Sequence, residues 1–120
     1  MNENASRPLS ITILSAVIAV AFLGSGAAKL VGVEKLAETF AHFGFGSGFM
    51  RFIGVAEVAG AVGLFLPRLA PLAAACLVPI MGGAVVLHAM HDPIAEALPP
   101  AVLGVLCAYL AYARRGELLR

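Results

Sequence analysis

Four long apolar runs, separated by short polar or proline-rich segments, dominate the chain. An α-helix needs about 20 apolar residues to cross the hydrocarbon core of a bilayer. The runs therefore predict four membrane spans, at about residues 9–29, 49–66, 69–90 and 98–113. The second and third spans are joined by the sequence LPRLAP. Two prolines so close together leave room only for a tight turn, so these two spans are predicted to form a helical hairpin.

The segment between the first two spans, at about residues 33–43, has a different pattern. Its apolar residues fall on one helical face and its polar residues on another: Val33, Leu36, Ala37, Phe40 and Phe43 against Glu34, Glu38 and His42. This amphipathic segment is too short to span a bilayer, so it predicts a helix lying in the membrane interface, with Gly44 as its end. An ordinary connecting helix would show the same pattern.

The composition supports a membrane protein. Of the 120 residues, 61% are hydrophobic and 12% are charged, whereas soluble domains have about 45–50% and about 25%. A chain of this length cannot bury so much apolar surface in one core. We therefore predict an all-α integral membrane protein, a bundle of four transmembrane helices forming a single domain over residues 1–120. The net charge of +1 gives no reason to expect a nucleic-acid partner.

The first run has a competing interpretation as a secretory signal peptide, because Arg7 precedes it and GSGAA resembles a cleavage site. The run is longer than the usual core of a signal peptide, which favours a span. Four spans place both termini on one side of the membrane. The arginines expected on that side are Arg7, Arg68, Arg114, Arg115 and Arg120. The positive-inside rule then predicts both termini in the cytoplasm, with a bacterial inner membrane as the host.

Glu57 lies about two helical turns inside the second predicted span. A carboxylate at that depth costs about 2.5–3.5 kcal/mol, so it should face other helices, a partner or water. Lys29, at the end of the first span, is the nearest plausible cation, and Ser25 shares its helical face. His88, late in the third span, is a second candidate partner for Glu57. These four residues outline a polar pocket in the outer half of the bundle, whereas the inner half is nearly all apolar.

Each of these residues also has a structural interpretation. Lys29 could be a snorkelling anchor at a helix end, Glu57 could make a structural ion pair, and His88 could be an interfacial polar cap. The spacing of His88, His91 and Asp92 could suit a metal ion, but the sequence offers no fixed further ligand, so we expect no metal.

Several short motifs resemble the DoxX-like family of small four-span membrane proteins. They are Gly26-Ala27-Ala28-Lys29-Leu30, Gly54-Val55-Ala56-Glu57-Val58-Ala59-Gly60, the hairpin Pro67-Arg68-Leu69, and His88. The resemblance extends from about Leu14 to Arg115. It implies an association with thiosulfate–quinone oxidoreduction or with membrane complexes that handle oxidative stress, and a more distant animal relative resembles a receptor-assembly chaperone.

The two cysteines, Cys76 and Cys107, do not form the C-x-x-C motif of thiol-redox membrane enzymes such as the quinone-reducing vitamin K family. We therefore interpret them as packed apolar residues and do not expect an enzyme that acts by itself.

Three functions remain open from the sequence. The first, which we rank highest, is an accessory subunit that binds another membrane protein or a redox enzyme, because the chain is small, has glycine-lined faces and shows no recognisable catalytic set. The second is a quinone- or lipid-binding component of a membrane redox system, for which the polar pocket is the signal. The third is a small-solute or proton pathway, against which the apolar inner half argues. A quinone is the one cofactor considered, and the partners left open beside the lipid bilayer include a second copy of the chain.

Overall fold

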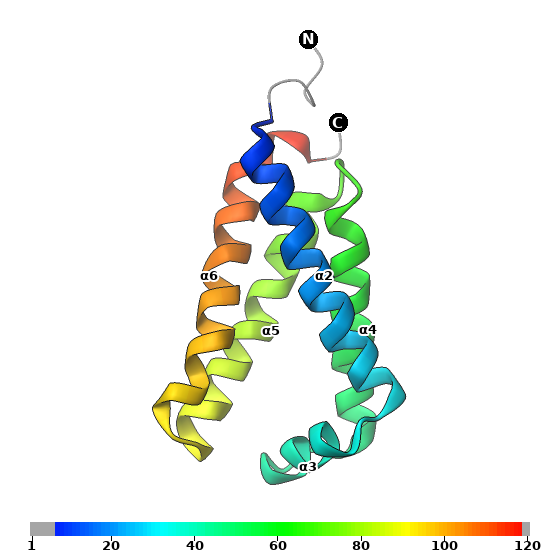
Figure 1. The fold of residues 1–120 in the computed structure, drawn as a ribbon, viewed down its shortest axis with the longest axis vertical. Coiled ribbons are helices and arrows are strands. Elements are labelled where there is room, and N and C mark those ends of the chain that lie inside the picture. Colours follow the sequence, from blue (N-terminus) through cyan, green and yellow to red (C-terminus); the bar gives the residue numbers. More distant parts are fainter. Residues whose placement is uncertain (1–6, 119–120) are drawn as a thin grey trace.

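The computed structural model describes residues 7–118, which form an all-helical bundle (Figure 1). Its long helices are α2 (Leu9–Val31), α4 (Ser47–Leu64), α5 (Ala70–His91) and α6 (Leu98–Ala113). The shorter elements are α3 (Glu34–His42) and the 3-10 helices η1 (Ile94–Ala97) and η2 (Arg115–Glu117). Within the described residues, four helical segments are long and apolar enough to cross a membrane. The predicted all-α membrane fold is confirmed.

The second span is the one whose predicted limits differ most from the structure. It was expected at 49–66, but α4 begins at Ser47 and ends at Leu64. Pro67 disfavours the helical conformation of the residue before it, so the helix ends ahead of the proline. The backbone carbonyl of Leu66 then accepts hydrogen bonds from the N–H groups of Leu69 and Ala70, which makes the predicted tight turn into α5.

The four long helices are arranged as two pairs. Helix α2 packs along α4, and α5 packs along α6. The pairs meet at the end that carries Arg7 and Leu118, and they diverge toward the end where α3 lies (Figure 1). We call these the closed end and the α3 end of the bundle.

The closed half has a layer of fully buried apolar side chains to which each long helix contributes. Phe22 comes from α2, Ala61 from α4, Leu77 from α5 and Leu110 from α6, and each is at most 1% exposed. Gly60 is needed for this packing, because a Cβ atom at that position would lie 2.7 Å from the side chain of Leu77. The α4–α5 contact therefore depends on the missing side chain.

Two glycines in the left-handed conformation direct the chain into and out of α3. Gly32 ends α2 with φ 77°, and its N–H group donates to the carbonyl of Ala28. Gly44 follows α3 with φ 93°, and its N–H group donates to the carbonyl of Ala41. Other residues adopt this conformation only at a cost, so both positions suit glycine. Gly44 thus follows the end of α3 as predicted.

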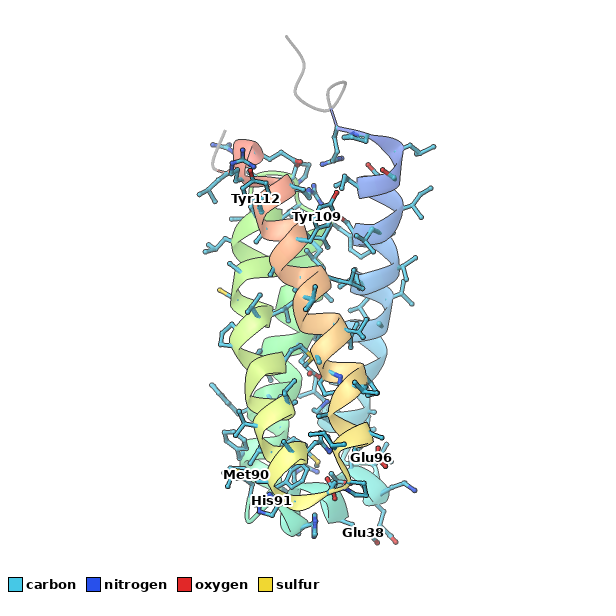
Figure 2. All side chains as sticks on the ribbon, turned by 90° about the vertical axis from the view of Figure 1, so that its left-hand side faces the viewer. Glu38, Met90, His91, Glu96, Tyr109 and Tyr112 are labelled. Carbon is cyan, nitrogen blue, oxygen red and sulfur yellow. The ribbon has the colours of Figure 1, made fainter. Side chains whose placement is uncertain are left out.

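The two ends of the bundle carry different kinds of side chain. Figure 2 shows Glu38, His91 and Glu96 near the α3 end, with Tyr109 and Tyr112 toward the opposite end. Both tyrosines are exposed. Charged and polar side chains at one end of the bundle and tyrosine rings at the other are consistent with two membrane–water interfaces.

The described ends of the chain lie together, because Arg7 donates a 2.6 Å hydrogen bond to the Glu117 carboxylate. The terminal residues themselves, 1–6 and 119–120, lie outside the described residues, so the prediction that both termini are cytoplasmic stays a prediction.

Candidate functional site

A close contact between α2 and α4 builds one wall of the site. A Cβ atom on Gly26 would lie 2.8 Å from the carbonyl oxygen of Gly54, and a Cβ atom on Gly54 would lie 2.9 Å from that of Gly26. Small residues let transmembrane helices approach this closely. The approach brings the face of α2 that carries Ser25 and Lys29 against the face of α4 that carries Glu57.

Ser25, Lys29 and Glu57 form a closed triangle of hydrogen bonds. The ammonium group of Lys29 donates to the Ser25 hydroxyl at 2.6 Å and to Oε1 of Glu57 at 2.9 Å. The Ser25 hydroxyl donates to the same Oε1 at 2.9 Å. Glu57 is only 1% exposed, so its charge is balanced by Lys29 rather than by water. The structure thus brings together these three of the four predicted site residues.

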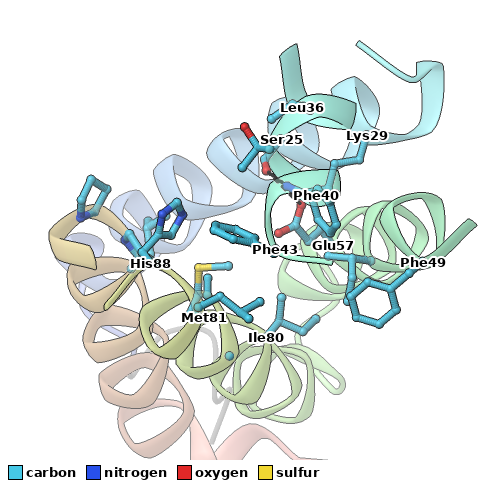
Figure 3. Close-up of a pocket in the computed structure, with 18 of the residues that line it drawn as sticks. Ser25, Lys29, Leu36, Phe40, Phe43, Phe49, Glu57, Ile80, Met81 and His88 are labelled. Carbon is cyan, nitrogen blue, oxygen red and sulfur yellow. Dashed lines mark hydrogen bonds and ion pairs between the residues drawn. The ribbon is translucent and has the colours of Figure 1, made fainter. Parts of the chain in front are cut away.

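The triangle faces a cavity of about 470 Å³ toward the α3 end of the bundle. All five α-helices of the described chain contribute to its walls, which are mostly apolar and aromatic. Leu36 and Phe40 of α3 line the cavity, as does Phe43 directly after the helix, so the apolar face of α3 is turned toward the bundle. Figure 3 shows these side chains around the cavity, with Ile80 and Met81 along its α5 side.

His88 lies across the cavity from the triangle, and it does not bond Glu57. Figure 3 shows the ring of Phe43 between the two groups. His88 Nδ1 is instead 2.9 Å from Oδ2 of Asp92, one helical turn further along α5. The expectation that His88 could be a direct partner of Glu57 was therefore wrong, because the rotation of α5 about its axis places the imidazole on the opposite wall. His88 still lines the same cavity.

Hydrogen-bonding capacity remains open on both walls. Within residues 7–118, Oε1 of Glu57 accepts both of the carboxylate's hydrogen bonds and Oε2 accepts none. In Figure 3 one carboxylate oxygen points to Lys29 and the other points into the cavity. Lys29 has three N–H donors and uses two of them. No described partner bonds Nε2 of His88, so this nitrogen is also free.

A second, polar cleft adjoins the cavity at the α3 end and shares Thr39 and His88 with it. The remaining residues of this polar cleft are Glu34, Lys35, Glu38, His42, Asp92 and Glu96. His42 of α3 reaches α5 here, with Nε2 3.4 Å from Oδ1 of Asp92. The polar cleft therefore adjoins the apolar cavity at Thr39 and His88. Within residues 7–118, no group of three His, Cys, Asp or Glu side chains is arranged to hold a metal ion.

A buried polar cluster at the closed end was missed by sequence reasoning, which counted Arg114 only among the arginines expected on one side of the membrane. Arg114 is 3% exposed and donates to both carboxylate oxygens of Glu117, to the Ser15 hydroxyl and to the backbone carbonyl of Leu64. Arg7 adds a further bond to Glu117. These five residues form the closed-end network. The i, i+3 spacing of Arg114 and Glu117 directly after an apolar run was the available signal.

The electrostatics of Glu117 follow from its partners. Burial alone raises the pKa of this carboxyl, but the hydrogen bonds and positive charges of Arg114 and Arg7 outweigh burial and hold the pKa below its ordinary value. The network therefore keeps its carboxylate ionised and ties η2 back to α2 and α4.

Comparison with known proteins identifies the relationship of this chain. The sequence model of the DoxX-like family matches residues 13–110, which is most of the chain and includes every residue of the triangle as well as His88. Neither a curated protein nor a solved structure matches the sequence.

Proposed function

The chain belongs to the DoxX-like family, and from this premise and the cavity we propose that it binds a small amphipathic molecule, such as a quinone, within the membrane. The observation that carries this proposal is the Lys29–Glu57 ion pair, which is buried at the wall of an otherwise apolar cavity. The polar head of the molecule lies between this pair and His88, and its apolar part contacts the aromatic and aliphatic walls.

Size and chemistry both favour a ligand of this kind. Pockets for small molecules usually measure about 300–1,000 Å³ and combine apolar walls with a few placed polar groups. The cavity has about 470 Å³ and meets that description. Burying the Glu57 carboxylate inside a membrane span costs free energy, and ionisable residues at such depth usually mark a functional site. The cavity therefore favours a quinone- or lipid-binding component over an accessory subunit. The accessory subunit stays a prediction, because no specific surface of the described residues supports a protein partner.

The proposed orientation follows from the distribution of arginines. Arg7, Arg68, Arg114 and Arg115 belong to the segments at the closed end, which we place at the cytoplasmic face of a bacterial inner membrane. The α3 end, with the cavity, then faces the periplasmic side. In intact cells, an impermeant thiol reagent should label Ser47→Cys at the α3 end but not Gly116→Cys at the closed end. The opposite labelling would reverse the orientation.

Two substitutions in α5 test binding with a matched control. Ala84 lines the cavity and Ala89 does not. Ala84→Phe should therefore fill part of the cavity, whereas Ala89→Phe adds the same volume to the same helix away from the cavity. Protein purified gently from membranes should carry a quinone or lipid that mass spectrometry detects in the wild type and in Ala89→Phe. Ala84→Phe should have lost it. Equal retention by both variants would refute binding in this cavity.

A further inference from the structure

Resting on the proposed function, we infer that the cavity selects the reduced form of its ligand, a hydroquinone or a similar aromatic diol, over the oxidised quinone. The two forms have nearly the same shape, so apolar walls cannot distinguish them. They differ in hydrogen bonding, because a hydroquinone carries two hydroxyl groups that donate and accept, whereas a quinone carries two carbonyl oxygens that only accept.

The triangle wall presents an acceptor and a donor side by side. Oε2 of Glu57 points into the cavity, from which it is accessible, and it accepts no hydrogen bond within the described chain. Lys29 retains one N–H beside it. A hydroxyl can donate to Oε2 and accept from Lys29 at once. A quinone carbonyl can accept from Lys29 but brings a second oxygen acceptor toward the carboxylate.

When His88 is neutral, the opposite wall also presents an acceptor. The Asp92 carboxylate accepts the proton of His88 Nδ1, which lies 2.9 Å from it. In a neutral imidazole the other nitrogen, Nε2, is then an acceptor. No described residue donates to it. A second hydroxyl on the ligand would meet this requirement, whereas a carbonyl would not.

The polar cleft agrees with a neutral ligand that bears donors. Its acidic side chains are Glu34, Glu38, Asp92 and Glu96, and Lys35 is its one basic residue besides histidine. This excess of negative charge beside the cavity disfavours anionic lipids and fatty acids. Neutral phenols and diols carry no such penalty.

The test uses one probe in two oxidation states. A fully ring-substituted para-benzoquinone with a decyl tail, and its hydroquinone kept reduced under nitrogen, are titrated onto the protein in lipid nanodiscs. The hydroquinone should bind about tenfold tighter or more, because the quinone leaves a buried acceptor unpaired. The dimethyl ether of the hydroquinone, which has no O–H donor, should bind as weakly as the quinone.

Glu57→Gln supplies the matched variant, since an amide keeps the shape of the carboxyl group but adds an N–H donor. It should weaken the preference for the hydroquinone, because one of the two acceptors is replaced while Nε2 of His88 remains, and thermal unfolding of the same sample checks that the variant is folded. If Glu57→Gln is unfolded, Ala84→Phe and the ether probe still decide the result. Equal binding of both oxidation states to a cavity that Ala84→Phe blocks would overturn this inference and leave the proposed function intact. Binding of neither form, or binding that Ala84→Phe leaves unchanged, would overturn both.

Discussion

Breaking the Lys29–Glu57 pair tests whether this contact is a true buried ion pair. The changes are Lys29→Met, Glu57→Leu and both together. Two unit charges 2.9 Å apart attract by about 6 kcal/mol at an effective dielectric constant of about 20. Removing both groups from water offsets much of that attraction, so the pair as a whole contributes little net stability. The cost appears when one partner is removed and the other is left buried without compensation.

Each single change should lower the free energy of unfolding by about 3–5 kcal/mol. The double change should cost at least about 2 kcal/mol less than the sum of the single changes, because residues in one ion pair are strongly coupled. We expect the double variant to fold at least as well as Lys29→Met alone, yet to have lost the bound amphiphile. Lys35→Met, on the exposed side of α3, is the control and should change stability by no more than about 0.5 kcal/mol.

The measurement is unfolding in mixed micelles by titration with sodium dodecyl sulfate, followed by circular dichroism. Additivity of the two single changes within about 0.5 kcal/mol would refute the coupling. A double variant that retains the amphiphile at the level of the wild type would refute the role of the pair in binding and leave it as a structural contact.

Three further changes probe other parts of the bundle. Gly54→Leu should separate α2 from α4 and lower the free energy of unfolding by about 1–3 kcal/mol or more. Gly48→Leu is the control and should leave stability unchanged, because Gly48 has open space around it. Similar melting temperatures for the two variants would contradict the close contact. Phe40→Glu should abolish retention of the amphiphile, because it places a charge in the apolar wall, and the exposed Glu38→Gln should be silent in the same mass-spectrometric assay; equal tolerance would argue that α3 does not close the cavity. Because the pKa of Glu117 is lowered in the folded state, its contribution to stability is present above the ordinary value of 4.5 and is lost as pH falls through the folded value. Glu117→Gln should therefore reduce the loss of stability at acid pH, measured as the free energy of unfolding against pH. An unchanged loss would exclude the closed-end network as its source.

The sequence predicted the parts of the site that depend on depth along a helix. Apolar run lengths gave the four spans, and the position of Glu57 within its run required a nearby partner. Lys29 and Ser25 could be assigned because they share a helical face at the matching level. Their contact in the structure follows from the glycines at the α2–α4 contact, which were visible as small residues at helical spacing.

The features that the sequence did not predict depend on rotation about a helix axis and on the path of the chain beyond a helix end. The hydrophobic pattern of α5 is nearly uniform around its circumference, so it could not show that His88 faces the cavity from the opposite wall. The i, i+4 spacing of His88 and Asp92 was visible, but from the sequence it was weighed only as part of a possible metal site. Arg114 entered the sequence analysis only as a surface charge, because hydropathy shows where a span ends and does not show that the chain folds back to bury the next charge.

The buried apolar layer of the closed half restricts the path that a ligand can take through the bundle. On every long helix this layer lies between the residues that line the cavity and the residues at the closed end; on α2, for example, Phe22 lies between Ser25 and Ser15. The layer is packed with side chains such as Phe22 and Leu77, which leave no polar surface for a file of water molecules. For the proposed ligand, this layer closes the path toward the closed end, so the ligand should enter and leave at the α3 end or sideways through the lipid. We therefore expect occupancy to respond to the concentration of the ligand but not to the voltage or the proton gradient across the bilayer.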